Sequence, residues 1–285
     1  MQAKPECYIC NMKQVLKTAA RITADPVLQK KVLYSAMDFL QKSDFETTPP
    51  ELGSDLYHLL CQELNAADPF RPEMDDYNRQ ALNLYPQLQQ ILARSGDRVY
   101  QALLMAVAGN LIDLGIIDSV NVAETLHAVL RTGLKIDDYA QFKELLPRAG
   151  NLLYIADNAG EIVFDRLLLE EIHRSYPAIR LIVAVKSGPA VNDALCQDAV
   201  AAGIEPLAEI IETGAACQGI PEQRCQPEFL RRFATADLII AKGHANFETM
   251  IPGGRAVFVL LRAKCKAVSA ELGVAVHDSV FKKLW

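Results

Sequence analysis

The chain has 285 residues, of which 51% are hydrophobic and 22% are charged, so it can bury one large or two ordinary cores. Its formal net charge of −6 argues against a protein that coats DNA or RNA by neutralising phosphates. No apolar run approaches the roughly 18 residues of a membrane helix, and the first residues lack the apolar stretch of a secretory signal. We therefore expect a cytoplasmic protein that has neither a nucleic-acid partner nor a membrane partner.

The seven cysteines are spread thinly along the chain, and we expect most of them to be reduced thiols. Only Cys7 and Cys10 form a close pair. Such a pair without a second one is half of a zinc site, and its use in redox chemistry would require a strand just before it. The residues after Cys10 have helical spacing instead. Two interpretations stay open: a metal or redox site, or two cysteines at the start of a helix.

The first half of the chain has the apolar spacing of helices, from Asn11 to about Leu146. Residues that disfavour helix divide it into segments. These breakers are Asp25-Pro26, Thr48-Pro49-Pro50, Asp68-Pro69, Ser95-Gly96-Asp97, Gly115 and Gly133. We therefore expect an all-helical N-terminal domain over residues 1–148.

The second half changes to short apolar runs, each followed by a helical stretch. The expected strands are residues 152–156, 181–185, 210–211, 238–241, 257–261 and 274–276. Runs that are apolar throughout are typical of parallel strands with helices on both faces of the sheet. We therefore expect an α/β domain over residues 149–285, with a mostly parallel sheet flanked by helices.

Polar, glycine-bearing segments follow three of these strands where the strands end. They are residues 157–161, 186–193 and 242–248. In open parallel sheets, ligands bind beyond the carboxyl ends of the strands. This edge of the sheet is therefore the expected location of the functional site.

The residue types in these segments indicate phosphoryl chemistry. Oxygen ligands from Asp157, Asn158 and Asp193 would suit Mg²⁺ or Mn²⁺. Lys242 could neutralise a phosphate and stabilise the charge that grows during its transfer. Together these residues predict a metal-assisted phosphoryl site.

Each motif also has a structural interpretation. Asn158 and Glu161 have the spacing of a capping box, and Asn192 or Asp193 could cap the next helix. Lys242 could be a lone surface lysine. Their recurrence at successive strand ends favours function, because helix starts do not require a lysine together with acidic groups such as Asp193 and Glu248.

Taken together, these motifs resemble a known family. The segments that carry the resemblance are Asp157-Asn158-Ala159-Gly160-Glu161, Asn192-Asp193, Lys242-Gly243-x-x-Asn246-x-Glu248 and Gly109-Asn110-x-x-Asp113. They look like the motifs of the metal-dependent damage-control phosphatases, and Cys7-x-x-Cys10 is similar to the prokaryotic stand-alone branch. The resemblance runs from Cys7 to the region of Cys265. It implies a helical N-terminal domain beside a Rossmann-like α/β domain.

The resemblance also implies an activity, a cofactor and a set of site residues. The activity would be hydrolysis of small phosphorylated metabolites, such as sugar phosphates or phosphopantetheine-like compounds, with Mn²⁺, Co²⁺, Ni²⁺ or Mg²⁺. By matching motifs, Asp157, Asn158 and Asp193 would be the metal ligands, and Lys242 would hold the phosphate. The residues expected around the substrate are Asn110, Asp113, Glu161, Asn246 and Glu248, of which Asn110 and Asp113 could instead be a buried polar pair.

The mechanistic hypothesis is in-line attack by a metal-activated water, with Asp157 and Lys242 as catalytic residues; a covalent role for Asp157 is the rival. Two other protein classes remain. One is a Rossmann-like methyltransferase or nucleotide-binding enzyme, although no G-x-G-x-x-G follows the first strand and no Walker loop is present. The other is a non-catalytic protein that binds a metal or a small molecule. The sequence does not predict the oligomeric state.

Overall fold

The centre of the protein, in a computed structural model, is a sheet in the strand order β1-β7-β6-β5-β2-β3-β4. The structure describes residues 1–44, 46–109, 131–253 and 256–285. The strands are β1 (Ile136–Asp137), β2 (Asn151–Ile155), β3 (Arg180–Val185), β4 (Glu209–Glu212), β5 (Leu238–Lys242), β6 (Ala256–Arg262) and β7 (Ser279–Lys283). Neighbouring strands are parallel except β6 and β7. The predicted α/β fold is confirmed.

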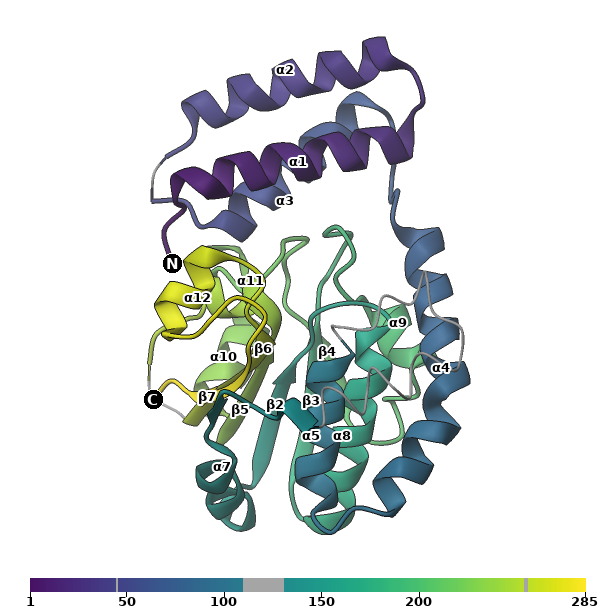
Figure 1. The fold of residues 1–285 in the computed structure, drawn as a ribbon, viewed down its shortest axis with the longest axis vertical. Helices are drawn as coiled ribbons and strands as arrows, with labels where there is room; N and C mark the ends of the chain where they lie inside the picture. Colours follow the sequence, from purple (N-terminus) through teal and green to yellow (C-terminus); the bar gives the residue numbers. More distant parts are fainter. Residues whose placement is uncertain (45, 110–130, 254–255) are drawn as a thin grey trace.

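Helices cover both faces of the sheet (Figure 1). One face carries α4 (Arg71–Ala93), α5 (Arg98–Ala108), α8 (Glu161–Ser175) and α9 (Cys196–Ala201); the other carries α10 (Pro227–Thr235), α11 (Gly243–Glu248) and α12 (Lys266–Leu272). The short helices α7 (Tyr139–Leu145), η1 (Leu146–Arg148) and η2 (Glu222–Arg224) lie in connections. Along β2, Leu152 and Tyr154 belong to one core and Leu153 and Ile155 to the other. Strand side chains alternate, so a strand buried on both faces must be apolar throughout.

Three helices form a separate layer above the carboxyl ends of the strands (Figure 1). We call α1 (Pro5–Ile22), α2 (Pro26–Lys42) and α3 (Pro49–Glu63) the cap. The cap has its own core of Val15, Ala19, Val32, Ala36, Leu56 and Leu60. The predicted breakers Asp25-Pro26 and Thr48-Pro49-Pro50 mark the starts of α2 and α3, because both helices begin with proline at a position where the missing N–H is not needed. The predicted breaker Gly115 lies outside the residues that the structure describes.

The other helices before residue 148 are part of the α/β unit. Helix α5 packs on α8, and strand β1 extends the sheet beside β7. Phe142 of α7 packs edge-on against Phe258 and Phe281 of the sheet. The boundary predicted near residue 148 therefore falls inside this unit, because helical spacing reveals a buried face but not the partner that buries it.

The strand predicted at residues 274–276 is wrong. Gly273, in the left-handed conformation at φ 71°, ends α12, and Val274 N donates to Ser269 O at 3.0 Å. Asp278 then accepts from Ala275 N at 2.9 Å, which makes a turn. The last strand, β7, begins only at Ser279. Among the helices that the structure describes, none is long and apolar enough to cross a membrane.

Candidate functional site

A cavity of about 780 Å³ lies where the strand order of the sheet reverses. The chain runs from β2 to β3 and β4 on one side, whereas β5 and β6 lie on the other side of β2. Ligands of open α/β sheets bind at such a point, beyond the carboxyl ends of the strands. Residues of the cap and of the strand-end loops line the cavity: Glu6, Cys7, Cys10, Asn11, Pro49, Pro50, Asp157, Asn158, Asn192, Gln218, His244, Ala245, Glu248, Lys264, Cys265, Lys266 and Ala267.

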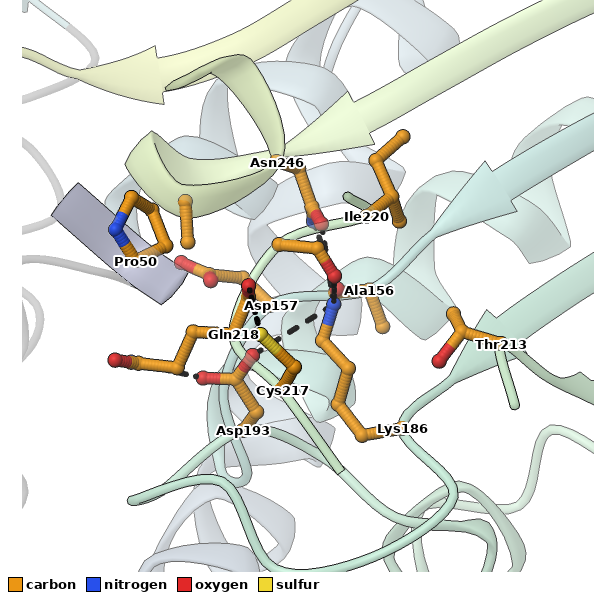
Figure 2. Close-up of polar contacts among 12 residues, drawn as sticks. Pro50, Ala156, Asp157, Lys186, Asp193, Thr213, Cys217, Gln218, Ile220 and Asn246 are labelled. Atoms are coloured by element: carbon orange, nitrogen blue, oxygen red, sulfur yellow. Dashed lines mark hydrogen bonds and ion pairs between the residues drawn. The ribbon is translucent and has the colours of Figure 1, made fainter. Parts of the chain in front are cut away.

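The three predicted metal ligands lie on two adjoining loops. We call residues 157–160 and 190–195 the site loops. Asn158 and Asp193 pair in an antiparallel bridge, and Ala194 N donates to Asp157 O at 2.8 Å. The side chains of Asp157 and Asp193 lie on these adjoining segments in Figure 2. The fold therefore brings together residues that are 36 positions apart, as the arrangement of strand ends predicted.

The helix-cap interpretation of these residues is wrong. Helix α8 has Gly160 as its N-cap, and helix α9 has Leu195. The amide nitrogen of Asn158 donates to Asp157 Oδ2 at 3.0 Å and to Glu161 Oε2 at 3.3 Å. An amide has one donor end and one acceptor end, so this pairing leaves the Asn158 oxygen as the end that can meet a cation.

The site carboxylates are buried close to one another. Asp157 is 7% exposed and Asp193 is 1% exposed. Burial raises the pKa of Asp157 well above its usual value, and the nearby Glu161 and Asp193 raise it further. Burial also raises the pKa of Asp193 to about 6, although the Lys186 ammonium opposes this shift. Both shifts express mainly the cost of burying a negative charge, and the neighbouring carboxylates add to that cost.

The backbone of Gly243 packs directly against the carboxylate of Asp157. A Cβ at this position would lie 2.0 Å from Asp157 Oδ2 and 2.2 Å from its Cγ. The backbone of Gly243 also has φ +80°, which glycine adopts without steric cost. The glycine in the Lys242-Gly243 motif therefore makes room for the Asp157 carboxylate.

Lys242 is fully buried, so its interpretation as a surface lysine is wrong. Its Nζ lies 2.5 Å from Glu161 Oε1, 2.6 Å from Asp165 Oδ1 and 2.9 Å from Ala106 O. Burial alone would lower the pKa of Lys242, but Asp165 and Glu161 outweigh burial and raise it. The structure thus places this ammonium in an ion-pair network behind Asp157, and Lys242 is not among the residues that line the cavity.

A second buried lysine, which the sequence analysis missed, lies beside Asp193. Lys186 is 1% exposed, and its Nζ donates to Gly219 O at 2.5 Å. The same nitrogen donates to Asn246 Oδ1 at 3.2 Å (Figure 2). Asp193 Oδ2 lies 3.7 Å from the same nitrogen and accepts no hydrogen bond from the described residues. Asn246 also donates to the carbonyl oxygens of Ala156 and Lys242, at 3.0 and 2.7 Å. The predicted substrate residue Asn246 is therefore held by the strand ends.

The cavity wall contains Glu248, which the sequence predicts as a substrate residue, together with His244 and Lys264. Burial raises the pKa of the Glu248 carboxyl to about 7. Burial lowers the pKa of His244 to about 4, so its ring is neutral at pH 7, and its Nε2 lies 2.8 Å from Arg262 O. Lys264 is exposed, and its charge lowers the pKa of Asp157. It is a cation in the wall near Asp157.

Cys7 and Cys10 lie within helix α1, with Cys10 exposed, and both line the cavity. Cys7 and Cys10 are free thiols, and no group of three His, Cys, Asp or Glu side chains arranged for a metal occurs in the described ranges. The predicted substrate residues Asn110 and Asp113 lie outside the residues that the structure describes.

Comparison with known proteins matches residues 3–280 to the damage-control phosphatase ARMT1-like domain. The chain is 34% identical to a damage-control phosphatase of Pyrococcus horikoshii, over 96% of this chain and 95% of that protein. It is 31% identical to a damage-control phosphatase of Archaeoglobus fulgidus, over 99% of each. The chain belongs to the damage-control phosphatase family. The crystal structure of a DUF89 family protein from Pyrococcus horikoshii superposes with a TM-score of 0.93 at 33% identity, covering 99% of both chains.

Membership of the damage-control phosphatase family supports phosphatase activity and agrees with the observed α/β fold. The site has three charged residues that sequence reasoning did not select, namely Asp165, Lys186 and Lys264. Asp165 follows Glu161 by four positions, so the two carboxylates share one face of α8, and this spacing was the available signal. Lys186 directly follows an apolar strand, as Lys242 ends one, and could have been found by the same reasoning.

Proposed function

We propose that this member of the damage-control phosphatase family hydrolyses small phosphorylated metabolites with a divalent metal ion held by Asp157, Asn158 and Asp193. The observation that carries the proposal is a buried excess of negative charge beside the cavity. Family membership supports the phosphatase activity, and the charge of the site supports its dependence on a metal.

The site cluster consists of six buried ionisable side chains, each at most 7% exposed: Asp157, Glu161, Asp165, Asp193, Lys186 and Lys242. Four carboxylates face two ammonium groups, which leaves two formal negative charges when all are ionised. A divalent cation would neutralise this excess. Asp193 Oδ2, which accepts no hydrogen bond from the described residues, and the amide oxygen of Asn158 are oxygen donors of the kind that Mg²⁺ and Mn²⁺ prefer.

The chain's own groups divide the remaining work. A bound divalent ion would polarise the phosphoryl oxygens and lower the pKa of a water molecule. Gly243 and the Asn158 amide fix the Asp157 carboxylate from two directions. This fixed arrangement supports attack by water rather than by Asp157, because a nucleophilic carboxylate would have to leave these contacts and reach the phosphorus atom.

The exposed Lys264 is the cation best located to meet the phosphate. Lys264 lines the same cavity as Asp157. The Nζ of Lys242 instead bonds to Ala106, Glu161 and Asp165 in the interior of the protein. We propose that Lys264 neutralises the phosphate and that Lys242, predicted to hold it, keeps Glu161 and Asp165 in place. Each protein donor aimed at the developing charge is worth roughly 3–4 kcal/mol in such sites.

A screen of sugar phosphates and phosphopantetheine derivatives tests the proposed function. Phosphate release should stop in excess chelator and return when Mn²⁺, Co²⁺, Ni²⁺ or Mg²⁺ is added in excess over the chelator. Asp157→Asn should stay inactive under every metal condition. Full activity in excess chelator would contradict the metal dependence, and turnover of no phosphate ester with any cation would contradict the phosphatase assignment.

Three lysine variants separate the two proposed roles. Lys264→Ala should lower kcat/KM by about a hundredfold to a thousandfold at nearly unchanged stability. Lys266→Ala is the matched control, because Lys266 is also exposed and also lines the cavity, and it should change kcat/KM less than threefold. Lys242→Met should instead destabilise the fold by about 3–5 kcal/mol, since it leaves two buried carboxylates without their cation. A fully stable but inactive Lys242→Met would return the phosphate role to Lys242.

A further inference from the structure

The two site loops are both tied to one helix that lines no part of the cavity. Asn78, in the middle of α4 and 4% exposed, accepts from Gly160 N at 2.7 Å through its side-chain oxygen. Its amide nitrogen donates to Asp198 Oδ1 at 2.6 Å. Asp198, at 0% exposure, accepts from Leu195 N at 2.9 Å through Oδ2. A chain of three side-chain hydrogen bonds therefore connects Gly160 to Leu195.

This connection closes on itself through the backbone. Ala194 N donates to Asp157 O at 2.8 Å, and Ala159 N donates to Asn192 O at 3.0 Å. The two site loops are thus linked directly by two backbone hydrogen bonds and a second time through the side chains of Asn78 and Asp198. A closed set of bonds restrains both loops together, because neither loop can shift without breaking a contact to the other.

Arg71, in the first turn of α4, fixes the carboxylate at the centre of this network. Its Nη1 and Nη2 donate to the two oxygens of Asp198 at 3.1 and 2.6 Å. A forked arginine contact of this type fixes the orientation of a carboxylate as well as its charge. The Asp198 side chain accepts all four of these hydrogen bonds and donates none, so the position suits a carboxylate and not an amide, which would add a donor.

We infer that Asn78 and Asp198 are positioning residues that set the geometry of the proposed metal ligands through the two site loops. The inference rests on the proposed function for its consequence, because loosened loops would hold the metal less well. Side chains that orient metal ligands are typically worth tenfold to a hundredfold in metal affinity.

The test compares three variants with the wild type. Asn78→Ala removes the link between the loops, and Asp198→Asn places an amide NH₂ against a ring of donors. Glu171→Gln is the matched control: Glu171, 4% exposed in α8, is held by the fork of Arg98 at 2.9 and 2.6 Å but does not touch the site loops. It should lower stability as much as Asp198→Asn does.

Hydrogen exchange of the metal-free protein, followed by mass spectrometry, decides the inference. Residues 157–160 and 190–195 should exchange at least tenfold faster in Asn78→Ala and Asp198→Asn than in the wild type, and at the wild-type rate in Glu171→Gln. Unchanged exchange in cooperatively folding Asn78→Ala protein would overturn the inference. Equal acceleration in Glu171→Gln would also overturn it, because the effect would then be a general loss of stability.

Calorimetric titration with Mn²⁺ tests whether loosened site loops bind the metal less tightly. The dissociation constant should rise about tenfold to a hundredfold in Asn78→Ala and Asp198→Asn and less than twofold in Glu171→Gln. A wild-type protein that binds no divalent ion would overturn the proposed metal chemistry, whereas the exchange experiment would still decide the positioning role. Wild-type affinity in Asn78→Ala would overturn the inference alone.

Discussion

Replacing Gly243 by alanine tests whether the position of Asp157 controls the activity. The added Cβ would lie 2.0 Å from Asp157 Oδ2, whereas ordinary contacts of a Cβ begin at about 3.4 Å. Either the carboxylate or the strand end must therefore move by about 1 Å. A misplacement of this size in an active site costs on the order of a hundredfold in rate. The positive φ of Gly243 adds about 1–2 kcal/mol of backbone strain.

Gly273→Ala is the matched control for this variant. Gly273 also has a positive φ, +71°, but a Cβ there meets nothing within 4 Å. This control carries the strain without the collision. It should lose about 1–2 kcal/mol of stability and keep its activity.

The assay measures phosphate release with saturating Mn²⁺ beside chemical denaturation of each variant. We expect Gly243→Ala to lose about a hundredfold in kcat at a cost of 1–3 kcal/mol, roughly, in unfolding free energy. Activity of Gly243→Ala within threefold of the wild type would refute the reasoning. An equal loss in Gly273→Ala would assign the effect to backbone strain.

Three further results are expected. Asp157→Asn and Asp193→Asn should each unfold in chelator at or above the wild-type temperature, because burial raises the pKa of both carboxyls and their ionised forms therefore cost stability. Added Mn²⁺ should stabilise only the wild type, and strong destabilisation of both variants would indicate a structural role. The folded-state pKa of Asp193, about 6, lies above the unfolded value near 3.9, so the folded protein holds a proton that the unfolded chain releases. In chelator, the protein should therefore lose stability as the pH rises from about 4 to 6, and this decline should be smaller in Asp193→Asn. The affinity for Mn²⁺ should fall below pH 6, because the proton competes with the metal. Asp55 accepts two hydrogen bonds from Arg224, at 2.7 and 2.9 Å, and these join the cap to the α/β unit. Asp55→Ala should lower the free energy of unfolding by about 1 kcal/mol or less and raise KM more than it lowers kcat. A KM equal to that of the wild type would show that this contact does not shape the cavity.

The convergence of Asp157 and Asp193 followed from the sequence. Each comes shortly after an apolar run without alternation, and parallel strands that start on the same side end at the same edge. The helix boundaries followed for a similar reason, since Pro26 and Pro49 act locally and need no tertiary partner. These features depend on the chain direction and on local backbone chemistry.

The surroundings of Lys242 did not follow, although part of the information was present. Residues 238, 240 and 242 share one face of β5, and Leu238 and Ile240 belong to the core beneath α5 and α8. Strand alternation therefore turns Lys242 into that core and away from the cavity. Finding its partners Glu161 and Asp165 additionally requires the rotation of α8 about its own axis, which helical spacing alone does not specify.

The sequence also did not predict which of the N-terminal helices form the cap and which pack on the sheet. The apolar face of α5 has the same spacing as that of α3, but α3 packs within the cap and α5 packs on α8. The choice between the two depends on contacts between segments far apart in the chain. The pattern of a single sequence does not contain them.

The cap and the strand-end loops contribute to the cavity in different ways. The cap supplies Glu6, Cys10 and Asn11 of α1 and the start of α3 to its wall, whereas the proposed metal ligands all come from loops of the sheet. Discrimination among leaving groups and cleavage of the phosphate ester can therefore change independently. Replacement of residues on the lower surface of the cap offers a route to new substrates that leaves the reacting centre intact.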